Sequence, residues 1–270
     1  MTREIRTTMQ QVQPEVYFIA DPCPTGELDT FFKNNSISWR PSEHAPWSEQ
    51  LIETAGRLCY LSWPNDQAVF ENLNLTRTRE TGHDYFKNIL KSGHGSILEH
   101  GNLVFIFDNV SRVFTHELVR HRTGCAYSQT SGRFVRTQEL SMWCPDVISK
   151  NPEANTIFNA LLVETEEALG KLNRLYKKDL EQGSFQRKKE LTSAFRRIAP
   201  TGVATKIMFS TNHRALRHIL VQRTSCGAET EIREIFWRVA LKMAKYFPNI
   251  YQDMLINEDK SVIFKYGNKI

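Results

Sequence analysis

The chain has 270 residues, of which 40% are hydrophobic and 24% charged, and 35 basic residues face 30 acidic ones. This apolar content can fill a sizeable core, and this length favours a single domain. A net charge of +5 argues against a protein that coats nucleic acid or membranes through bulk charge alone.

The cysteines and the lack of long apolar stretches indicate the cellular compartment. Five cysteines without C-x-x-C spacing argue against a disulfide framework and against a zinc site. The N-terminal sequence lacks the apolar core of a signal peptide, and no apolar run approaches the roughly 18 to 20 residues of a membrane span. We therefore expect a soluble cytoplasmic protein with reduced thiols and no membrane partner.

The first third of the chain is predicted to contain one strand and two helices. Residues 1–13 are expected to form a loose arm, and the aromatic and β-branched residues of 15–20 indicate a strand. A first helix covers 47–60, and a second lies within 78–95 and ends at Gly93, a common helix stop. The apolar face of the first helix is predicted from helical spacing. Its residues are Leu51, Ile52, Ala55, Leu58 and Cys59.

The middle of the chain is predicted to place a central strand and a helix before a polar segment. Residues 102–110 include five consecutive apolar residues, which indicates a strand buried on both faces. Ser111 is a suitable N-cap for a helix that continues to Arg122. The hydroxyl-rich residues 127–137 predict an irregular or edge segment exposed to a ligand.

The remainder of the chain is predicted to be mainly helical. Residues 152–182 have the pattern of one long helix or a hinged pair. Residues 205–212 resemble a strand, Asn212 can cap the helix that follows, and 229–246 have the apolar spacing of an amphipathic helix. Neither a repeat nor a Gly/Ser-rich linker divides the chain, so we expect one domain over residues 1–270.

Basic residues are concentrated in two segments. Residues 112–136 hold five arginines and one acid, Glu117, whereas residues 196–223 hold six basic residues and no acid. Arginine suits phosphate and carboxylate, because its planar fork binds them bidentately. On a helix, the consecutive residues Arg120–Arg122 would point about 100° apart, so one of them must face inward or toward a ligand. We expect a bound anion, with a solvated basic face as the alternative.

Other reactive residues give weaker indications. The eight histidines form no H-E-x-x-H motif, and pairs five residues apart diverge on a helix, so no metal site is predicted. Cys125 follows His121, but its sequence neighbours supply no base with an orienting acid, so packing is a simpler interpretation than nucleophilic catalysis. Glycine loops typical of dinucleotide-binding folds are missing, so a nucleotide would be held by arginines and backbone amides.

Four motifs, in the same order along the chain, resemble those of the flavin-dependent thymidylate synthases. The sequence "RHR" at 120–122, followed by "YSQTSGRF" at 127–134, is similar to the Arg-His-Arg motif of that family and its Ser-x-Arg ending. Three further segments resemble family motifs: residues 55–60, 89–107 and 210–223. The resemblance spans most of residues 50–245.

The spacer after "RHR" departs from that of the family: either Thr130 replaces the motif serine, or one extra residue is present and Ser131 is the match. Thr130 stands at the usual serine position, and Ser131 follows it. We favour Ser131 as the match, because the serine then stays two residues before Arg133. Gly124 can adopt the unusual dihedral angles that absorb an insertion. Phe134 also replaces a common tyrosine.

The resemblance implies a fold, an assembly and a reaction. The fold would be of the α/β (α+β) class, a single domain with a central mixed sheet flanked by helices and a long helical segment. The assembly would be a homotetramer with shared active sites. The reaction would be the reductive methylation of dUMP to dTMP. Methylenetetrahydrofolate would give the one-carbon unit, reduced FAD the hydride, and NADPH would re-reduce the flavin.

The resemblance also implies roles for the residues that match the family's motifs. Arg223 would act in catalysis by contacting the uracil ring, which makes its C5 more nucleophilic. The flavin would be bound by His94, Ser96, Arg120, His121, Arg122, Gln129, Asn212, Arg214 and His218. The nucleotide would be bound by Glu117, where the family often has glutamine, and by Arg120, Gln129, Ser131, Gly132, Arg133, Arg197 and Arg223.

Two other functions fit parts of the same pattern. A C5-methylase of UMP on the same scaffold would share these motifs, and turnover of dUMP against UMP separates the two activities. A nucleic-acid-binding module would use the same basic segments, would show strongly salt-dependent binding and would be colourless.

Overall fold

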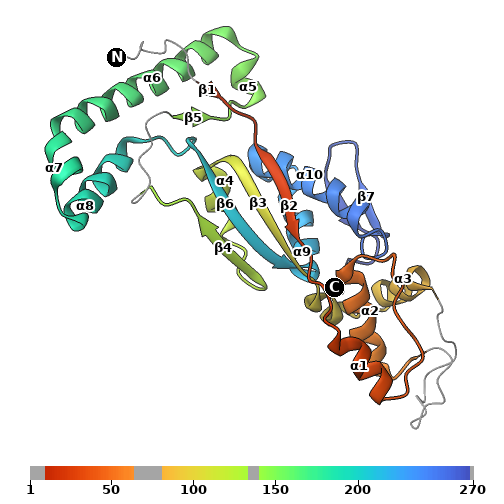
Figure 1. Cartoon of the computed structure of the whole chain (residues 1–270). Coiled ribbons are helices and arrows are strands. Elements are labelled where there is room, and N and C mark those ends of the chain that lie inside the picture. The colour runs from red at the N-terminus through yellow and green to blue at the C-terminus, as the bar shows by residue number, and fades with distance from the viewer. Residues whose placement is uncertain (1–9, 64–80, 133–139, 268–270) are drawn as a thin grey trace. The chain divides into compact units, whose positions relative to one another are not determined.

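The computed structural model describes residues 10–63, 81–132 and 140–267, and within them the chain mixes helices and strands in the predicted α+β class (Figure 1). The chain forms two compact units. The first comprises the chain up to Tyr17, Ile106–Arg120 and Tyr127–Met208, and the second comprises Phe18–Phe105, His121–Ala126 and the chain from Phe209 onward. A single domain over the whole chain stays a prediction.

A four-stranded sheet has the order β2-β3-β6-β4, and each of its strands has residues in both units. The Thr130 N–H donates to the Lys206 carbonyl, and the Asn212 N–H donates to the Gly124 carbonyl, so β4 and β6 run antiparallel. β4 lies at the edge of the sheet, as predicted for this polar segment. The strands are β2 (Glu15–Ala20), β3 (Asn102–Ser111), β4 (Cys125–Gln129) and β6 (Ala204–Asn212).

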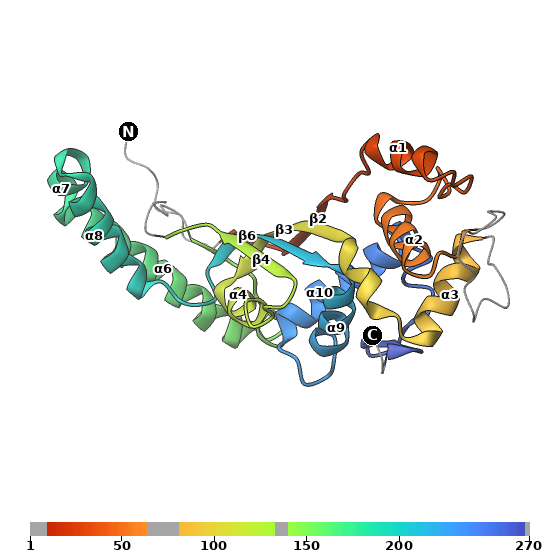
Figure 2. The same ribbon diagram turned by 90° about the horizontal axis from the view of Figure 1, so that it is seen from below.

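Strand β3 is fully buried on one face only. Leu103, Phe105 and Phe107 are fully buried, whereas Val104 and Ile106 between them are half-buried. The prediction that β3 is buried on both faces was therefore wrong for the single chain. Figure 2 shows helices beside the sheet residues of each unit taken by itself. In the first unit this is α4 (Arg112–Leu118), and in the second these are α9 (His213–Arg223) and α10 (Thr230–Tyr246).

Helix α2 (Trp47–Tyr60) buries Ile52 of the predicted apolar face, but most of its buried residues are polar. Glu53 and Arg57 form a buried ion pair at 2.7 Å, and the Arg57 guanidinium lies over two aromatic rings. Leu58 and Cys59, which were predicted to point inward, are exposed. The prediction was wrong because charged side chains with tertiary partners occupy the inner face of this helix.

Most other predicted elements are confirmed. The helix α3 (Gly82–Ser92) ends at Gly93 in the left-handed conformation. The long helical segment is a hinged pair, α6 (Pro152–Leu175) and α7 (Lys177–Gln182), separated at Tyr176. The remaining helices are α1 (Glu27–Asn34), α5 (Asp146–Ser149), α8 (Phe185–Phe195) and the 3-10 helices η1 (Gly95–His100) and η2 (Arg196–Ile198).

Two small sheets complete the described fold. Strands β1 (Gln10–Gln11) and β5 (Ser141–Met142) pair in parallel, and β7 (Met254–Ile256) pairs antiparallel with β8 (Val262–Phe264). Within the described ranges, no helix is both long enough and apolar enough to cross a membrane.

Candidate active site

The Arg-His-Arg segment lies in a turn beyond helix α4. Ser111 caps this helix by accepting the Phe114 N–H at 3.0 Å, as predicted, and the helix ends at Leu118. The Tyr127 hydroxyl donates to the Leu118 carbonyl at 3.1 Å and so satisfies an acceptor at the end of the helix. The prediction that Arg120–Arg122 continue the helix was therefore wrong.

A tight turn connects Arg122 to Cys125 after the Arg-His-Arg segment. The Cys125 N–H donates to the Arg122 carbonyl at 3.2 Å, and Gly124 has a φ of 69°. Side chains are strained at such a φ, and a Cβ on Gly124 would also lie within 3.0 Å of Asn212 Nδ2. Gly124 thus adopts the unusual dihedral angle that was predicted for it, and its role in absorbing an insertion stays a prediction. The Cys125 thiol lies 3.4 Å from the Thr211 hydroxyl, which fits a packing role.

Both ends of helix α9 contact this turn. At its N-terminus, Asn212 caps the helix by accepting the Ala215 N–H at 2.8 Å, and its own N–H donates to the Gly124 carbonyl at 3.3 Å. At its C-terminus, Arg223 Nε donates to His121 Nε2 at 2.7 Å. The second unit thus brings the catalytic candidate Arg223 against the predicted flavin residue His121.

The basic segment around α9 is partly neutralised by acids from elsewhere in the chain. Three of its basic side chains form ion pairs that could not be predicted from the sequence, because their partners lie far away along the chain. The pairs are Lys206 with Asp108, Arg214 with Glu99, and Arg217 with Asp253. Only part of this segment is therefore available to a bound anion.

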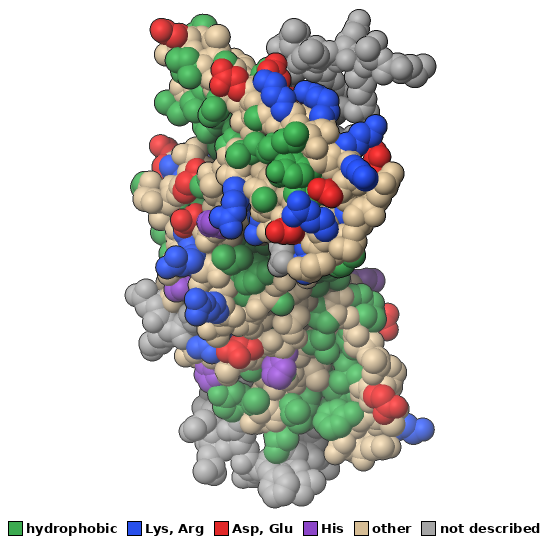
Figure 3. Space-filling view, turned by 90° about the vertical axis from the view of Figure 1, so that its left-hand side faces the viewer, with side chains coloured by type: hydrophobic (Ala, Val, Ile, Leu, Met, Phe, Trp, Pro, Cys, Tyr) green, Lys and Arg blue, Asp and Glu red, His purple; other side chains and the backbone are tan. Residues whose placement is uncertain are grey.

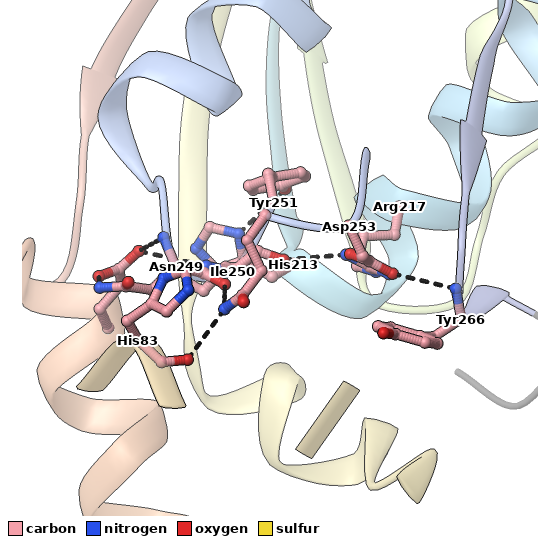
Figure 4. A network of polar contacts seen from close by, with 10 residues as sticks. His83, His213, Arg217, Asn249, Ile250, Tyr251, Asp253 and Tyr266 are labelled. Carbon is pink, nitrogen blue, oxygen red and sulfur yellow. Dashed lines mark hydrogen bonds and ion pairs between the residues drawn. The ribbon is translucent and has the colours of Figure 1, made fainter. Parts of the chain in front are cut away.

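A buried polar network holds α9 against the C-terminal segment (Figure 4). Arg217 donates to both oxygens of Asp253 at 2.8 and 2.9 Å and to the Ile250 carbonyl at 2.9 Å. The two side chains are only 3% and 1% exposed, and the guanidinium lies 3.8 Å from the centre of the Phe264 ring. Separating this pair would leave a buried charge unpaired, so the network resists movement of α9.

Helix α2 contacts the same C-terminal segment. Glu49 accepts the backbone N–H groups of Asn249 and Ile250 at 2.9 and 3.3 Å, and the Asn249 side-chain amide at 2.7 Å. Burial raises the pKa of Glu49, although these donors act against the shift. Helices α2 and α9 are therefore connected through one short stretch of chain.

His213, the first residue of α9, is fully buried beside this network. Its Nδ1 lies 3.0 Å from the Tyr251 hydroxyl. Burial, with the nearby charge of Arg217 as a second cause, lowers the pKa of His213 to about 3. Burial also raises the pKa of Tyr251. His213 is thus neutral near pH 7 and serves packing, not ligand binding.

His94, a predicted flavin residue, contacts an aromatic residue of α2. The Tyr60 hydroxyl lies 2.6 Å from His94 Nδ1, and the two rings pack edge to face with centres 5.2 Å apart. Ser96 is exposed on η1, and His218 is exposed on α9. Tyr60 belongs to the 55–60 motif, but no role was predicted for it from the sequence.

The first unit contains a cavity of about 490 Å³ with a cationic side and an apolar side. Arg112, Arg196 and Arg197 line the cationic side together with Thr130 and Gly132. A Cβ on Gly132 would lie 3.5 Å from Arg112 Nη2, so the backbone there passes close to this guanidinium. The apolar side includes Leu140, Leu169, Phe195 and Val203.

This cavity brings together only some of the predicted nucleotide residues. Gly132 and Arg197 line it, whereas Ser131 is half-buried and is not part of the lining. Arg133 lies outside the described residues. Sequence reasoning missed Arg112 and Arg196, because a charge excess shows that arginines gather but not which of them face a cavity.

Basic side chains also gather near the helical segment of the first unit. Figure 3 shows Lys and Arg side chains concentrated in the upper half of one face, where helices α7 and α8 lie. Many are compensated by acids: Arg187, for example, pairs with Glu190 at 2.9 Å and Asp179 at 3.5 Å. This face is an ordinary solvated charged surface.

Three other predicted residues lie in the first unit outside the cavity lining. Gln129 Nε2 donates to the Thr115 hydroxyl at 3.3 Å, Glu117 is half-buried, and Arg120 is exposed. No group of three His, Cys, Asp or Glu side chains suited to a metal occurs among the residues that the structure describes.

These features describe an α+β protein with an arginine-lined cavity in its first unit and a contact between Arg223 and His121 in its second. A model of the family described as thymidylate synthase complementing protein matches residues 42–249. Flavin-dependent thymidylate synthases of Mycolicibacterium gilvum and Corynebacterium glutamicum are 34% and 32% identical to this chain, covering 82% and 81% of it and 84% and 87% of their own length. A further one, from Mycobacterium avium, is 33% identical over 78% of the chain and 84% of its own length. The chain belongs to the family of flavin-dependent thymidylate synthases.

Proposed function

We propose that the protein catalyses the reductive methylation of dUMP to dTMP, with methylenetetrahydrofolate as the one-carbon donor, FAD as the flavin and NADPH as its reductant. The observation that carries this proposal is the arginine-lined cavity beside the Ser-Gly-Arg segment. Family membership and the names of the relatives support the same reaction.

The cationic side of the cavity would hold the nucleotide phosphate. Arg112, Arg196 and Arg197 offer planar forks that match phosphate oxygens, and the lack of a side chain at Gly132 lets the phosphate approach the backbone closely. Arg133, the next residue, would complete this set. Such charge-assisted bonds fix the position of the nucleotide and leave the pyrimidine free to meet the flavin.

Arg223 would contact the uracil ring. A fixed guanidinium beside the N3–O2 region stabilises negative charge there, and electron density then increases at C5, the carbon that accepts the one-carbon unit. No nucleophilic side chain is required in this scheme, which agrees with the packing role of Cys125 beside Thr211.

The donor set of the second unit fits a flavin dinucleotide. The guanidinium of Arg122 and the exposed imidazole of His218 could donate hydrogen bonds to a pyrophosphate. His94 and Ser96, at the start of η1, would add further polar groups. When bound, reduced FAD supplies the hydride. The chain's own residues would bind and orient the flavin.

We also propose that the chain forms a homotetramer with shared active sites. The uncovered sheet face carries exposed apolar side chains: Tyr17 and Ile19 are 45% exposed and Met208 is 41% exposed. Burial of such a face in an interface removes apolar surface from water. Light scattering should give four times the chain mass of 31.3 kDa, and a monomer would contradict this assembly.

Absorbance of the purified protein after addition of FAD and removal of the excess tests the flavin directly. We expect the spectrum of a bound flavin in the visible range. A protein that remains colourless and binds DNA in a salt-dependent manner would support the nucleic-acid-binding alternative instead. Turnover of UMP in preference to dUMP would assign the chain to the related UMP methylases.

A further inference from the structure

The contact between Arg223 and His121 joins residues from two of the motifs. Arg223 is the last residue of α9, and His121 is the central residue of the Arg-His-Arg turn. Arg223 Nε donates to His121 Nε2 at 2.7 Å, and both side chains are half-buried. This distance is that of a strong hydrogen bond to a guanidinium.

The backbone on both sides of this contact is held in place. Arg217, near the middle of α9, is fixed by its buried bidentate pair with Asp253, and Asn212 connects the start of the helix to Gly124 in the same turn. Rotation of the Arg223 side chain, not movement of α9, therefore decides where its guanidinium points.

The direction of the hydrogen bond fixes the state of the histidine. A guanidinium has only donors and keeps its proton, so His121 Nε2 must accept. A ring nitrogen that accepts carries no proton, and the ring is then neutral with its proton on Nδ1. A protonated ring would set donor against donor and place two positive charges side by side.

We propose that His121 is a positioning residue for Arg223, a role additional to contact with the flavin. One hydrogen bond at Nε fixes the plane of the guanidinium, and this plane contains the four N–H groups of Nη1 and Nη2 that would face the pyrimidine. The inference rests on the proposed function, because it concerns the arginine that would act on the uracil ring.

The arrangement makes the methylation step sensitive to pH. Arg223 on α9 contacts His121, and Arg120 and Arg122 are its chain neighbours, so these three residues place positive charge on its contact partner and on both sides of it in the sequence. When His121 gains a proton at acid pH, its bond to Arg223 is lost and the guanidinium leaves its fixed orientation. Methylation should then fall on the acid side of the profile.

Two substitutions separate positioning from general structural effects. In His121→Gln, a side-chain oxygen can still accept from Arg223 but does not titrate, whereas His121→Leu removes the acceptor. At saturating FAD and dUMP, we expect about a hundredfold lower kcat for His121→Leu, a cost typical of a misplaced catalytic group. His121→Gln should recover most of this loss, and its pH profile should lack the acid limb of the wild type.

Flavin affinity, measured by titration with FAD for each variant, controls for the predicted contact between His121 and the flavin. The inference is overturned if both variants lose only flavin affinity, or if His121→Gln keeps the acid limb. Failure of the proposed function has a different signature, because the wild type itself would then form no dTMP.

Nitrogen NMR of the ligand-free protein supplies a readout that does not depend on activity. The histidine signals missing from His121→Gln identify His121. We expect Nε2 to be unprotonated and Nδ1 to carry the proton, and we expect the Nε2 signal to shift in Arg223→Ala. A protonated Nε2 in the wild type, or no shift in Arg223→Ala, would refute the hydrogen bond on which the inference depends.

Discussion

Replacement of Gly124 by alanine should perturb the turn that holds the Arg-His-Arg segment against α9. Gly124 has a φ of 69°, which costs about 1–2 kcal/mol for a residue with a Cβ. The new Cβ would lie within 3.0 Å of Asn212 Nδ2 and 3.1 Å from its Cγ, so the Asn212 side chain must move. Loss of its cap on α9 would cost about a further 1 kcal/mol.

The expected loss for Gly124→Ala is therefore about 2–3 kcal/mol in the free energy of unfolding. Gly227→Ala is a matched control, because a Cβ on Gly227 would have nothing within 4 Å. Urea denaturation of the ligand-free variants measures both. Because the displaced Asn212 starts helix α9, Gly124→Ala should also bind FAD more weakly. Equal stability and equal FAD affinity of the two variants would refute this reasoning.

Three further predictions concern other parts of the molecule. Asp253→Asn should lower the free energy of unfolding by about 3–5 kcal/mol, because the buried Arg217 loses its counter-charge. Denaturant unfolding should show little change in this free energy for Asp259→Asn, at an exposed position. Similar losses for both variants would contradict a special role for the buried pair. The pKa of His213, lowered to about 3 from 6.5, means that the unfolded chain takes up a proton in this interval, so stability should fall with decreasing pH by about 1.4 kcal/mol per unit. His213→Gln removes this proton uptake and should therefore reduce the slope by nearly this amount. An unchanged slope would show that His213 is not buried as a neutral ring. Arg196→Ala should raise the KM for dUMP about tenfold or more, because a charged hydrogen bond to the nucleotide is lost. Arg187→Ala, on the solvent face of α8, should leave this KM unchanged. Steady-state kinetics of both variants measures the difference, and equal KM values would contradict a role of Arg196 in binding dUMP.

Local sequence patterns were sufficient for most elements of the fold. The apolar spacing of α10 predicted its inner face, with Ile232, Phe236, Val239 and Met243 all fully buried. Ser111 and Asn212 were predicted as caps because short polar side chains at a helix start accept free backbone N–H groups. Such signals act over a few residues, and a sequence displays them directly.

Tertiary partners explain where the sequence was misleading. Helix α2 has an apolar stripe, but the buried ion pair of Glu53 and Arg57 turns a charged face inward. The end of α4 at Leu118 depends on the Tyr127 hydroxyl from a neighbouring strand, and no glycine or proline marks this end in the sequence. A pattern along the chain contains no information about partners that only folding brings close.

In the candidate site, too, local features were predictable and tertiary contacts were not. The motifs predicted which segments matter, and Gly124 was predicted to absorb the insertion. The contact of Arg223 with His121 and the presence of Arg112 in the cavity arise from packing between distant segments. A count of positive charges could not distinguish Arg217, which forms a buried ion pair with Asp253, from Arg196, which lines the cavity.

Formation of dTMP from dUMP tests the central claim most directly. Purified protein would be incubated with dUMP, methylenetetrahydrofolate, NADPH and FAD, and the nucleotides would be identified by mass. We expect dTMP in amounts exceeding the enzyme, no dTMP when the flavin has been removed, and little methylation of UMP. Absence of dTMP from a protein that carries bound FAD, or formation of dTMP without any flavin, would contradict it.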